Sequence, residues 1–296
     1  MKTTNLMRKT ENRAGWLFIL PFMLMFVGFK LYPMISGFWI SFLDRNSLKN
    51  VYSNKFVWFK NYIYVFKNAD VRESMVHTLE FSAIYTVLMM SLSLVLAAVF
   101  NHKFKGRGIV RTMFYMPYVT NFVVIGIVWK YLLNPYDGPV NKLLGVFIPQ
   151  DKLPQWLLSF TGALPTTAII ATWVGLTFAL VTFLAAMQDI PEDLYEVASI
   201  EGATPAQVFF QITLPLLKPT FFMLLTIVLI NSFKNFNTIV GLTEGGPGTS
   251  TMVMSFKIYN DAFKYYKYAI ASAEGMLMTI VIFIVNTVLG KLKKEN

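Results

Sequence analysis

Six long apolar runs, separated by short polar segments, dominate the hydrophobic pattern of this chain. Each run is long enough to cross the roughly 30 Å hydrocarbon core of a bilayer as a helix that rises about 1.5 Å per residue. Strands of a membrane β-barrel would show alternating polarity over about 10 residues, and the sequence has no such segment. The pattern predicts an all-α membrane protein with six transmembrane helices, which cover Trp16–Ser36, Val76–Phe100, Ile109–Leu133, Leu164–Met187, Thr220–Val240 and Tyr268–Leu289.

The composition agrees with a bilayer as the solvent. Of the 296 residues, 55% are hydrophobic and 14% are charged, whereas soluble domains average about 25% charged residues. The net charge of +10 is spread over many short segments, which fits anionic lipid headgroups rather than nucleic acid. Without cysteine the chain has no disulfide, and His77 and His102 flank opposite ends of one apolar run, so we expect no metal site.

Basic residues gather at three places that fall on one side of the membrane when six spans are drawn. They are the arm over residues 1–15, the segment Lys103–Arg107 and the C-terminal segment Lys291–Lys294. Short basic segments near helix ends favour the cytoplasmic side, so we expect both termini to be cytoplasmic. The first run is too long for a cleaved signal peptide and has no clear cleavage site, which indicates an uncleaved anchor.

The polar segment 188–218 after the fourth run predicts two short helices. Pro191 suits the first turn of a helix, and Glu192 and Asp193 suit the positive end of its dipole. Gly202 is expected to end this first helix, because glycine readily adopts the left-handed conformation of a helix C-terminus.

The second short helix carries its own start signals. Thr204 is expected to cap it, with Pro205 at its first position and Gln207 completing a capping box. Pro215 and Pro219 are then expected to break the chain before the fifth span, because proline cannot continue a helix without strain.

The same segment is acidic although the whole chain is basic. Its carboxylates are Asp189, Glu192, Asp193, Glu196 and Glu201, and its one base is Lys218. Two interpretations are open at this point. The segment is either a solvated helix pair or a docking element whose carboxylates meet a basic partner surface.

A motif inside the segment resembles that of the permease subunits of bacterial binding-protein-dependent, ATP-driven importers. The family signature is Glu-Ala-Ala, three residues, Gly, nine residues and Ile-x-Leu-Pro. This chain matches it at the same spacing with Glu196, Val197, Ala198, Gly202, Ile212, Leu214 and Pro215. The one departure is Val197, which stands where the family has alanine. The resemblance implies that 188–218 is a cytoplasmic loop that couples the permease to separate ATPase subunits.

Other stretches extend the resemblance over nearly the whole chain, toward the maltose and glycerol-phosphate permease branch. They are Phe56–Tyr62, Arg107 with Gly108 and Arg111, Tyr115–Tyr118, and Leu242–Pro247 with Thr251. The Gly-Gly-Pro turn in Leu242–Pro247 is similar to that of the larger permease of a heterodimer. This chain lacks the large extracellular insertion of the maltose permease, so no role of that insertion is carried over.

The resemblance implies an architecture and a set of partners. The chain would be an arm over residues 1–15 followed by a six-helix permease domain over 16–296, with the fold of a type I importer. Its partners would be a second homologous permease, two ATPase subunits, an extracellular binding protein, a sugar-type substrate and membrane lipid. The chain has no phosphate-binding loop. We therefore expect no enzymatic activity and no cofactor in it, with ATP and Mg²⁺ bound by the ATPase subunits.

Polar residues in the fourth and fifth runs are candidates for the substrate pathway. In a continuous fifth helix, Asn231, Asn235 and Thr238 would share one face at i, i+4 and i+7, and their amides and hydroxyl could bind sugar hydroxyls. By resemblance to the maltose permease, the positions that match its sugar site are Val174, Gly175, Phe178, Ser232 and Asn235. The alternative is that these polar groups join helices to one another.

Two charges lie inside predicted spans, Lys234 in the fifth and Glu274 in the sixth. A charge near the middle of a membrane costs at least about 2.5–3.5 kcal/mol. Both residues lie in the outer halves of their spans, so they could form a salt bridge. They could also face the substrate, or reach the membrane surface.

Two other classes of function agree less well with the sequence. An ion-coupled secondary transporter would show internal repeats and discontinuous helices; we find no repeat, and this class leaves the 188–218 motif unexplained. A membrane-embedded enzyme would need convergent catalytic groups, and the sequence has no histidine–carboxylate or metal-binding arrangement.

Overall fold

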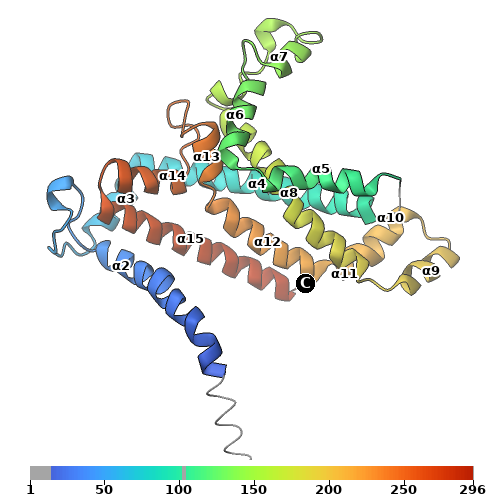
Figure 1. The fold of residues 1–296 in the computed structure, drawn as a ribbon, viewed down its shortest axis with the longest axis horizontal. Coiled ribbons are helices and arrows are strands. Elements are labelled where there is room, and N and C mark those ends of the chain that lie inside the picture. The colour runs from blue at the N-terminus through green and yellow to red at the C-terminus, as the bar shows by residue number, and fades with distance from the viewer. Residues whose placement is uncertain (1–14, 102–104, 296) are drawn as a thin grey trace, which may run out of the picture. The chain divides into compact units, whose positions relative to one another are not determined.

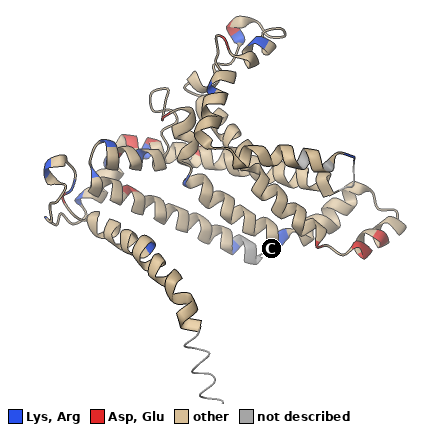
Figure 2. Cartoon of the chain, viewed as in Figure 1, with Lys and Arg blue, Asp and Glu red and all other residues tan. Residues whose placement is uncertain are grey.

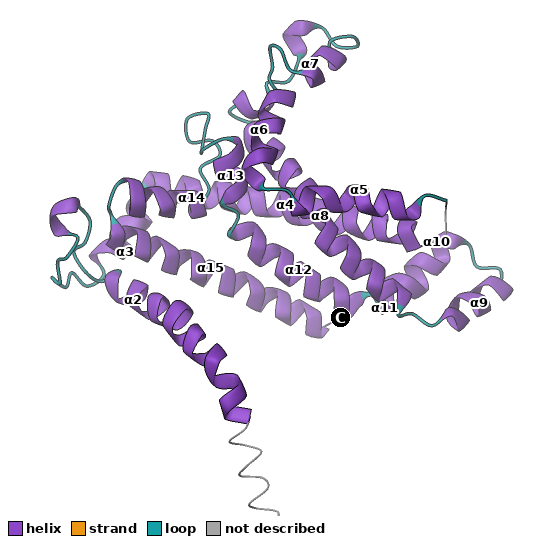
Figure 3. Ribbon diagram, in the orientation of Figure 1, coloured by secondary structure: helices purple, strands orange, loops and turns teal. Residues whose placement is uncertain are grey.

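The computed structural model describes residues 15–101 and 105–295, and within them all regular structure is helical (Figures 1 and 3). The one β-type contact in this part of the chain is an isolated bridge between Leu43 and Phe56. The predicted all-α class is confirmed. The predicted arm over residues 1–15 lies outside the described residues except for Gly15, and so does Lys103.

The chain contains α-helices, 3-10 helices and π-helices (both labelled η). Their bounds are η1 Val27–Leu31, α2 Tyr32–Ile40, η2 Leu48–Asn50, α3 Lys60–Lys67, α4 Ala69–Asn101, α5 Arg107–Val119, α6 Phe122–Leu132, α7 Pro139–Leu144, η3 Gln150–Lys152, η4 Trp156–Leu158, α8 Ala163–Gln188, α9 Glu192–Ile200, α10 Pro205–Val208, η5 Phe209–Thr213, α11 Leu214–Leu216, α12 Lys218–Phe233, α13 Asn237–Leu242, α14 Met254–Tyr259, η6 Asn260–Lys264 and α15 Tyr268–Glu295.

Four of the helices are continuous and apolar enough to cross a membrane. They are Gly15–Ile40, Ala69–Asn101, Ala163–Gln188 and Tyr268–Lys291. Each contains most or all of a predicted run, so four predicted spans correspond to unbroken helices. The other two predicted spans are interrupted.

The third predicted span is a bent pair of helices. The angle between Thr112–Val119 and Phe122–Leu132 is 108°. The helix ends because Thr120 has an extended backbone, with ψ of 141°. Asn121 is also extended, and its side chain accepts a hydrogen bond from the amide of Val123, which caps α6. The predicted run Ile109–Leu133 is therefore a bent pair of helices and not one continuous helix.

The fifth predicted span ends earlier than expected. Helix α12 stops at Phe233, and α13 begins only at Asn237. In the break, the amide of Asn235 donates to the carbonyl of Ser232, and its side-chain oxygen accepts from the amide of Thr238. The prediction of one continuous helix over Thr220–Val240 was wrong, because the chain leaves the helical conformation after Phe233 and α13 begins only at Asn237.

The chain divides into two compact units. The first consists of Met1–Lys67 and Ile258–Leu277, and the second of Asn68–Lys257 and Met278–Asn296. The single six-helix domain over 16–296 stays a prediction.

In the first unit, the buried Asn61 holds the segment that precedes α3. Its side-chain nitrogen donates to the carbonyls of Ser41 and Leu43 at 2.8 and 2.9 Å. Its side-chain oxygen accepts from Asn46, whose own oxygen accepts from the amide of Ile270 at 3.0 Å. Asn61 belongs to the stretch Phe56–Tyr62. This family-like stretch therefore supplies the side chain that forms the buried hydrogen bonds of this segment.

The core of the second unit is built around α4 and α8, which pack along each other, with α5 and α12 against them (Figure 1). Large side chains such as Phe81, Met89, Leu180 and Phe183 are buried there. Small residues let the helices approach closely, which is how helices associate in an apolar solvent. A side-chain carbon added at Gly175 of α8 would lie 2.7 Å from the terminal methyl of Met89 in α4, so the methionine side chain would have to move to make room for it.

Candidate functional site

The first short helix of the loop 188–218 ends in a Schellman motif at Gly202. Helix α9 covers Glu192–Ile200, and Gly202 has a φ of +77°. The amide of Gly202 donates to Ser199 and the amide of Ala203 donates to Ala198, at 3.1 and 2.9 Å. These two bonds define the motif. The predicted end of the first helix is confirmed.

The second short helix begins as predicted. Thr204 caps α10, and Pro205 is its first residue. The threonine hydroxyl accepts from the amide of Gln207, while the side-chain oxygen of Gln207 accepts from the amide of Thr204 at 2.8 Å. This reciprocal pair is the predicted capping box.

The predicted break before the fifth span is present, and it lies between Pro215 and Pro219 rather than at Pro215 itself. The run from Pro205 to Leu216 continues through the π-turn Phe209–Thr213, in which the amide of Leu214 bonds to the carbonyl of Phe209. The wider turn changes the hydrogen-bond register just before Pro215, where the ring would otherwise clash with the preceding turn. The chain bends by 68° only after Leu216, where α12 starts.

Helix α9 has an inner and an outer face. Tyr195 and Ala198, three residues apart, point inward, with Ala198 buried and Tyr195 packed against the apolar core of the second unit. Val197 and Ile200 point outward, with exposed fractions of 55% and 86%. Because position 197 faces outward, the larger valine there meets no core packing. This explains how the one departure from the motif is accommodated.

The outer face of α9 is both acidic and apolar. Figure 2 shows acidic residues in red on α9, where Glu192, Asp193 and Glu196 are all exposed. They lie beside the exposed apolar side chains of Leu194 and Ile200. Of the remaining motif residues, Ile212 and Leu214 are half-buried and Pro215 is exposed. The structure thus places the motif on one protruding loop whose acidic side faces away from the core.

A cavity of about 200 Å³ lies in the second unit and is lined from α4, α5, α8 and α12. Three residues of the predicted pathway line it, namely Gly175, Phe178 and Asn231. Tyr85 and Tyr118 also line it, and neither was predicted to lie on the substrate pathway. We call it the tyrosine cavity. It offers aromatic faces, two phenol hydroxyls and one amide.

Gly175 keeps the tyrosine cavity open. A side-chain carbon at this position would lie 2.8 Å from the hydroxyl of Tyr85. The cavity also lies beside both helix breaks. Tyr118 precedes the end of α5 by one residue, and Asn231 precedes the end of α12 by two.

The other predicted pathway residues lie elsewhere. Val174 is buried in a separate apolar cluster with Ile125 and Leu242. Ser232 is buried and donates to the carbonyl of Leu229 in its own helix at 2.7 Å.

The predicted common face of the fifth helix does not exist. Asn231 lies in α12, Asn235 in the break and Thr238 in α13, so no single helix carries them. Asn231 is exposed on the cavity side, whereas Thr238 is buried. The spacing i, i+4, i+7 therefore did not indicate a shared surface.

Lys234 and Glu274 belong to different units. Lys234 is exposed at the end of α12, and Glu274 is buried in α15. Their pairing stays a prediction. Among residues 15–101 and 105–295, no group of three His, Asp or Glu side chains could hold a metal ion.

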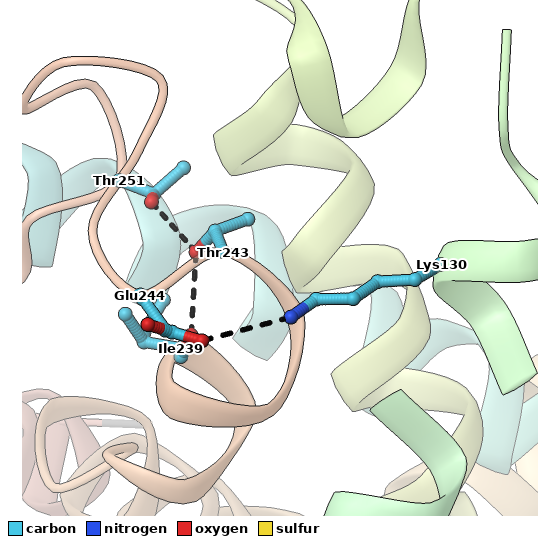
Figure 4. A network of polar contacts seen from close by, with 5 residues as sticks. All are labelled: Lys130, Ile239, Thr243, Glu244 and Thr251. Carbon is cyan, nitrogen blue, oxygen red and sulfur yellow. Dashed lines mark hydrogen bonds and ion pairs between the residues drawn. The ribbon is translucent and has the colours of Figure 1, made fainter. Parts of the chain in front are cut away.

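The Gly-Gly-Pro turn is organised by hydroxyl groups (Figure 4). The hydroxyl of Thr251 donates to the hydroxyl of Thr243 at 2.7 Å and lies 2.8 Å from the carbonyl oxygen of Gly246. Glu244 has a φ of +52°, and its carboxylate lies 3.8 Å from the amine of Lys130 on α6. Both charged groups are exposed, so the ion pair contributes little stability. Its position links the turn after α13 to α6.

Comparison with known proteins identifies relatives along nearly the whole chain. The family model described as "Binding-protein-dependent transport system inner membrane component" matches residues 82–294. The trehalose/maltose transport system permease protein MalF of Thermococcus litoralis is 31% identical over 99% of this chain and 98% of its own. The multiple sugar-binding transport system permease protein MsmF of Streptococcus mutans is 29% identical over 97% and 98%.

A solved structure shares the fold. One chain of a bacterial alginate ABC transporter, crystallised with a pentasaccharide-bound periplasmic protein, matches with a TM-score of 0.84. It is 24% identical, and the match covers 97% of this chain and 96% of that one. On this family match and these relatives, the chain belongs to the inner membrane components of binding-protein-dependent transport systems, the permease subunits of ABC transporters.

Proposed function

We propose that this chain is the permease subunit of an ATP-driven sugar importer. Relatives named as sugar permeases support this proposal. The helices allow up to six spans. An even number of spans would place both termini on one side of the membrane, and we infer that this side, with the loop 188–218, is the cytoplasm. The chain would pair with a second permease and receive its substrate from an extracellular binding protein.

The loop 188–218 is the proposed docking element for an ATPase subunit. The observation that carries the proposal is the position of the motif, whose acidic residue Glu196 lies on the exposed face of α9 while Ala198 anchors the opposite face. Exposed carboxylates beside exposed apolar side chains suit a cleft with a basic rim and an apolar floor. ATP and Mg²⁺ would be bound by the ATPase subunits, and this chain would catalyse no reaction.

The tyrosine cavity is the proposed place on this chain where the sugar binds during passage. Aromatic faces pack against the apolar face of a sugar ring, and hydroxyl and amide groups bond to its hydroxyls. None of the nine residues that line the cavity is charged. The lining therefore favours an uncharged sugar over a phosphorylated or acidic one.

The alternative class, an ion-coupled secondary transporter, would show internal repeats and discontinuous helices, and two bent helix pairs are present here. Membership of the importer family nevertheless leaves it without support.

The discriminating experiment uses the assembled transporter in proteoliposomes, with a sugar first identified by thermal shift of the cognate binding protein. We expect uptake that requires ATP and the binding protein and persists after proton and sodium gradients are collapsed. Uptake by this chain without ATPase subunits, driven by an ion gradient, would contradict the proposal.

A further inference from the structure

One contact joins the inner face of α9 to the π-turn that precedes α12. The hydroxyl of Tyr195 lies 3.2 Å from the hydroxyl of Thr213, within hydrogen-bond distance. The ring of Tyr195 packs against the apolar core of the second unit, and Thr213 is 6% exposed. The contact is therefore shielded from most of the solvent, where a hydrogen bond is stronger than in water.

Thr213 lies directly before the bend into α12. It is the last residue of the π-turn, and its carbonyl accepts a hydrogen bond from the amide of Leu217 at 3.0 Å. Leu217 is the residue at which the chain turns by 68°, and its own carbonyl accepts from the amide of Phe221 in α12 at 2.8 Å. Two further backbone bonds thus connect Thr213 to the first turns of α12.

The space beside this contact is not filled. A cavity of about 280 Å³ lies between the loop and the ends of α4 and α8. Tyr195 and Thr213 line one side of it, and Ala98, Asn101 and Met187 line the other. Tyr195 packs against the core beside this cavity, whereas the cavity leaves the rest of the space between α9 and the ends of α4 and α8 unfilled. The Tyr195–Thr213 hydrogen bond adds a directional polar link from α9 toward α12.

We propose that Tyr195 is a positioning residue of transport, which transmits the movement of a docked α9 through Thr213 to α12. This inference rests on the proposed function, in which an ATPase subunit holds the outer face of α9. Helix α12 carries Asn231 in the tyrosine cavity. A displacement of α9 would therefore reorient Asn231, because the Tyr195–Thr213 hydrogen bond and the bend at Leu217 connect α9 to α12.

The test measures how accessible position 231 in the tyrosine cavity is, and it does not require the sugar to be identified. The chain has no cysteine, so Asn231→Cys introduces one reporter, in a complex whose partners are also freed of cysteine. The labelling rate of this cysteine by a maleimide is compared with and without ATP and vanadate. Retention of the ATPase subunits during purification is measured on the same samples.

Tyr195→Phe removes only the hydroxyl. Thr213→Val keeps the size of the threonine, and it also removes the bond from the threonine hydroxyl to the carbonyl of Val208 at 3.5 Å. We expect each to reduce the ATP-dependent change in labelling about two- to tenfold, the range that one lost hydrogen bond gives in an equilibrium. The ATPase subunits should stay bound. The double variant should be no worse than the more affected single variant, because both changes remove the same interaction.

Two hydroxyl deletions serve as matched controls. Tyr131→Phe changes an exposed residue of α6, and Thr182→Val removes a hydroxyl that bonds only within its own helix, to the carbonyl of Phe178. Both variants should show the same ATP-dependent change in labelling rate as the parent complex. If Tyr195→Phe also labels like the parent while ATP still changes the parent's labelling rate, the proposed role of Tyr195 is wrong. If the parent complex does not retain its ATPase subunits or shows no ATP-dependent change, the proposed function itself fails.

Discussion

A side-chain carbon on Gly126 would lie 2.4 Å from the carbonyl oxygen of Gly241, so helices α6 and α13 touch backbone to backbone. Both helices follow a break in a predicted span. Their glycine contact and the Lys130–Glu244 pair therefore join the two segments that lie beyond the breaks. The segments that follow the two breaks, α6 and α13, are therefore packed against each other in the second unit.

Gly126→Ala should destabilise the protein, because the added methyl group has no space and backbone atoms must move. Overpacking of this kind costs about 1–3 kcal/mol. We expect a lower midpoint of thermal unfolding for the purified complex, with a smaller effect for Gly241→Ala, whose added carbon would lie 3.2 Å from the nearest atom. Gly290→Ala is the control, since nothing lies within 4 Å of its added carbon. Equal midpoints for Gly126→Ala and Gly290→Ala would refute the close approach.

Gly202→Ala should impair transport through backbone strain alone. The added carbon meets no atom within 4 Å, but the φ of +77° costs an L-residue about 1–2 kcal/mol. We expect slower uptake at an unchanged amount of protein in the membrane. Gly202→Asn should be milder, because asparagine tolerates this conformation better. An alanine variant that transports like the parent would show that the Schellman end of α9 is not needed.

Asn231→Ala should weaken substrate handling, because its amide is the one amide group of the tyrosine cavity. Loss of a hydrogen bond to a neutral group costs about 0.5–1.5 kcal/mol. We expect a higher KM for uptake with unchanged basal ATP hydrolysis. Asn235→Ala is the contrasting variant. Its side-chain oxygen accepts a hydrogen bond from the amide of Thr238 in α13, so the change should lower thermal stability more than it raises KM. A raised KM with unchanged thermal stability in Asn235→Ala would instead indicate that Asn235 contacts the substrate.

The features that the sequence predicted well are local. The capping box at Thr204 and the helix end at Gly202 depend on a few adjacent residues, and both are present. The breaks at Thr120–Asn121 and at Asn235 were missed because hydropathy averages over a run and does not report backbone direction. A polar residue with capping ability inside each run, Asn121 and Asn235, was the available signal.

The tyrosine cavity was predicted only in part. Resemblance supplied Gly175 and Phe178, and polarity supplied Asn231. Tyr85 and Tyr118 were missed because an aromatic residue in an apolar run fits lipid contact equally well. Their convergence depends on how α4 and α5 pack against α8, which no local pattern specifies.

The most direct test of the account is the charge reversal Glu196→Lys in the assembled transporter. Glu196 is exposed on α9, so the change should leave the fold and membrane insertion intact while it opposes docking to a basic cleft. Asp151→Lys, an exposed carboxylate outside the loop, is the matched control. The measurement is the rate of ATP hydrolysis stimulated by the substrate-loaded binding protein. The account predicts that stimulation is lost in Glu196→Lys and kept in Asp151→Lys, whereas full stimulation in Glu196→Lys would contradict coupling through this loop.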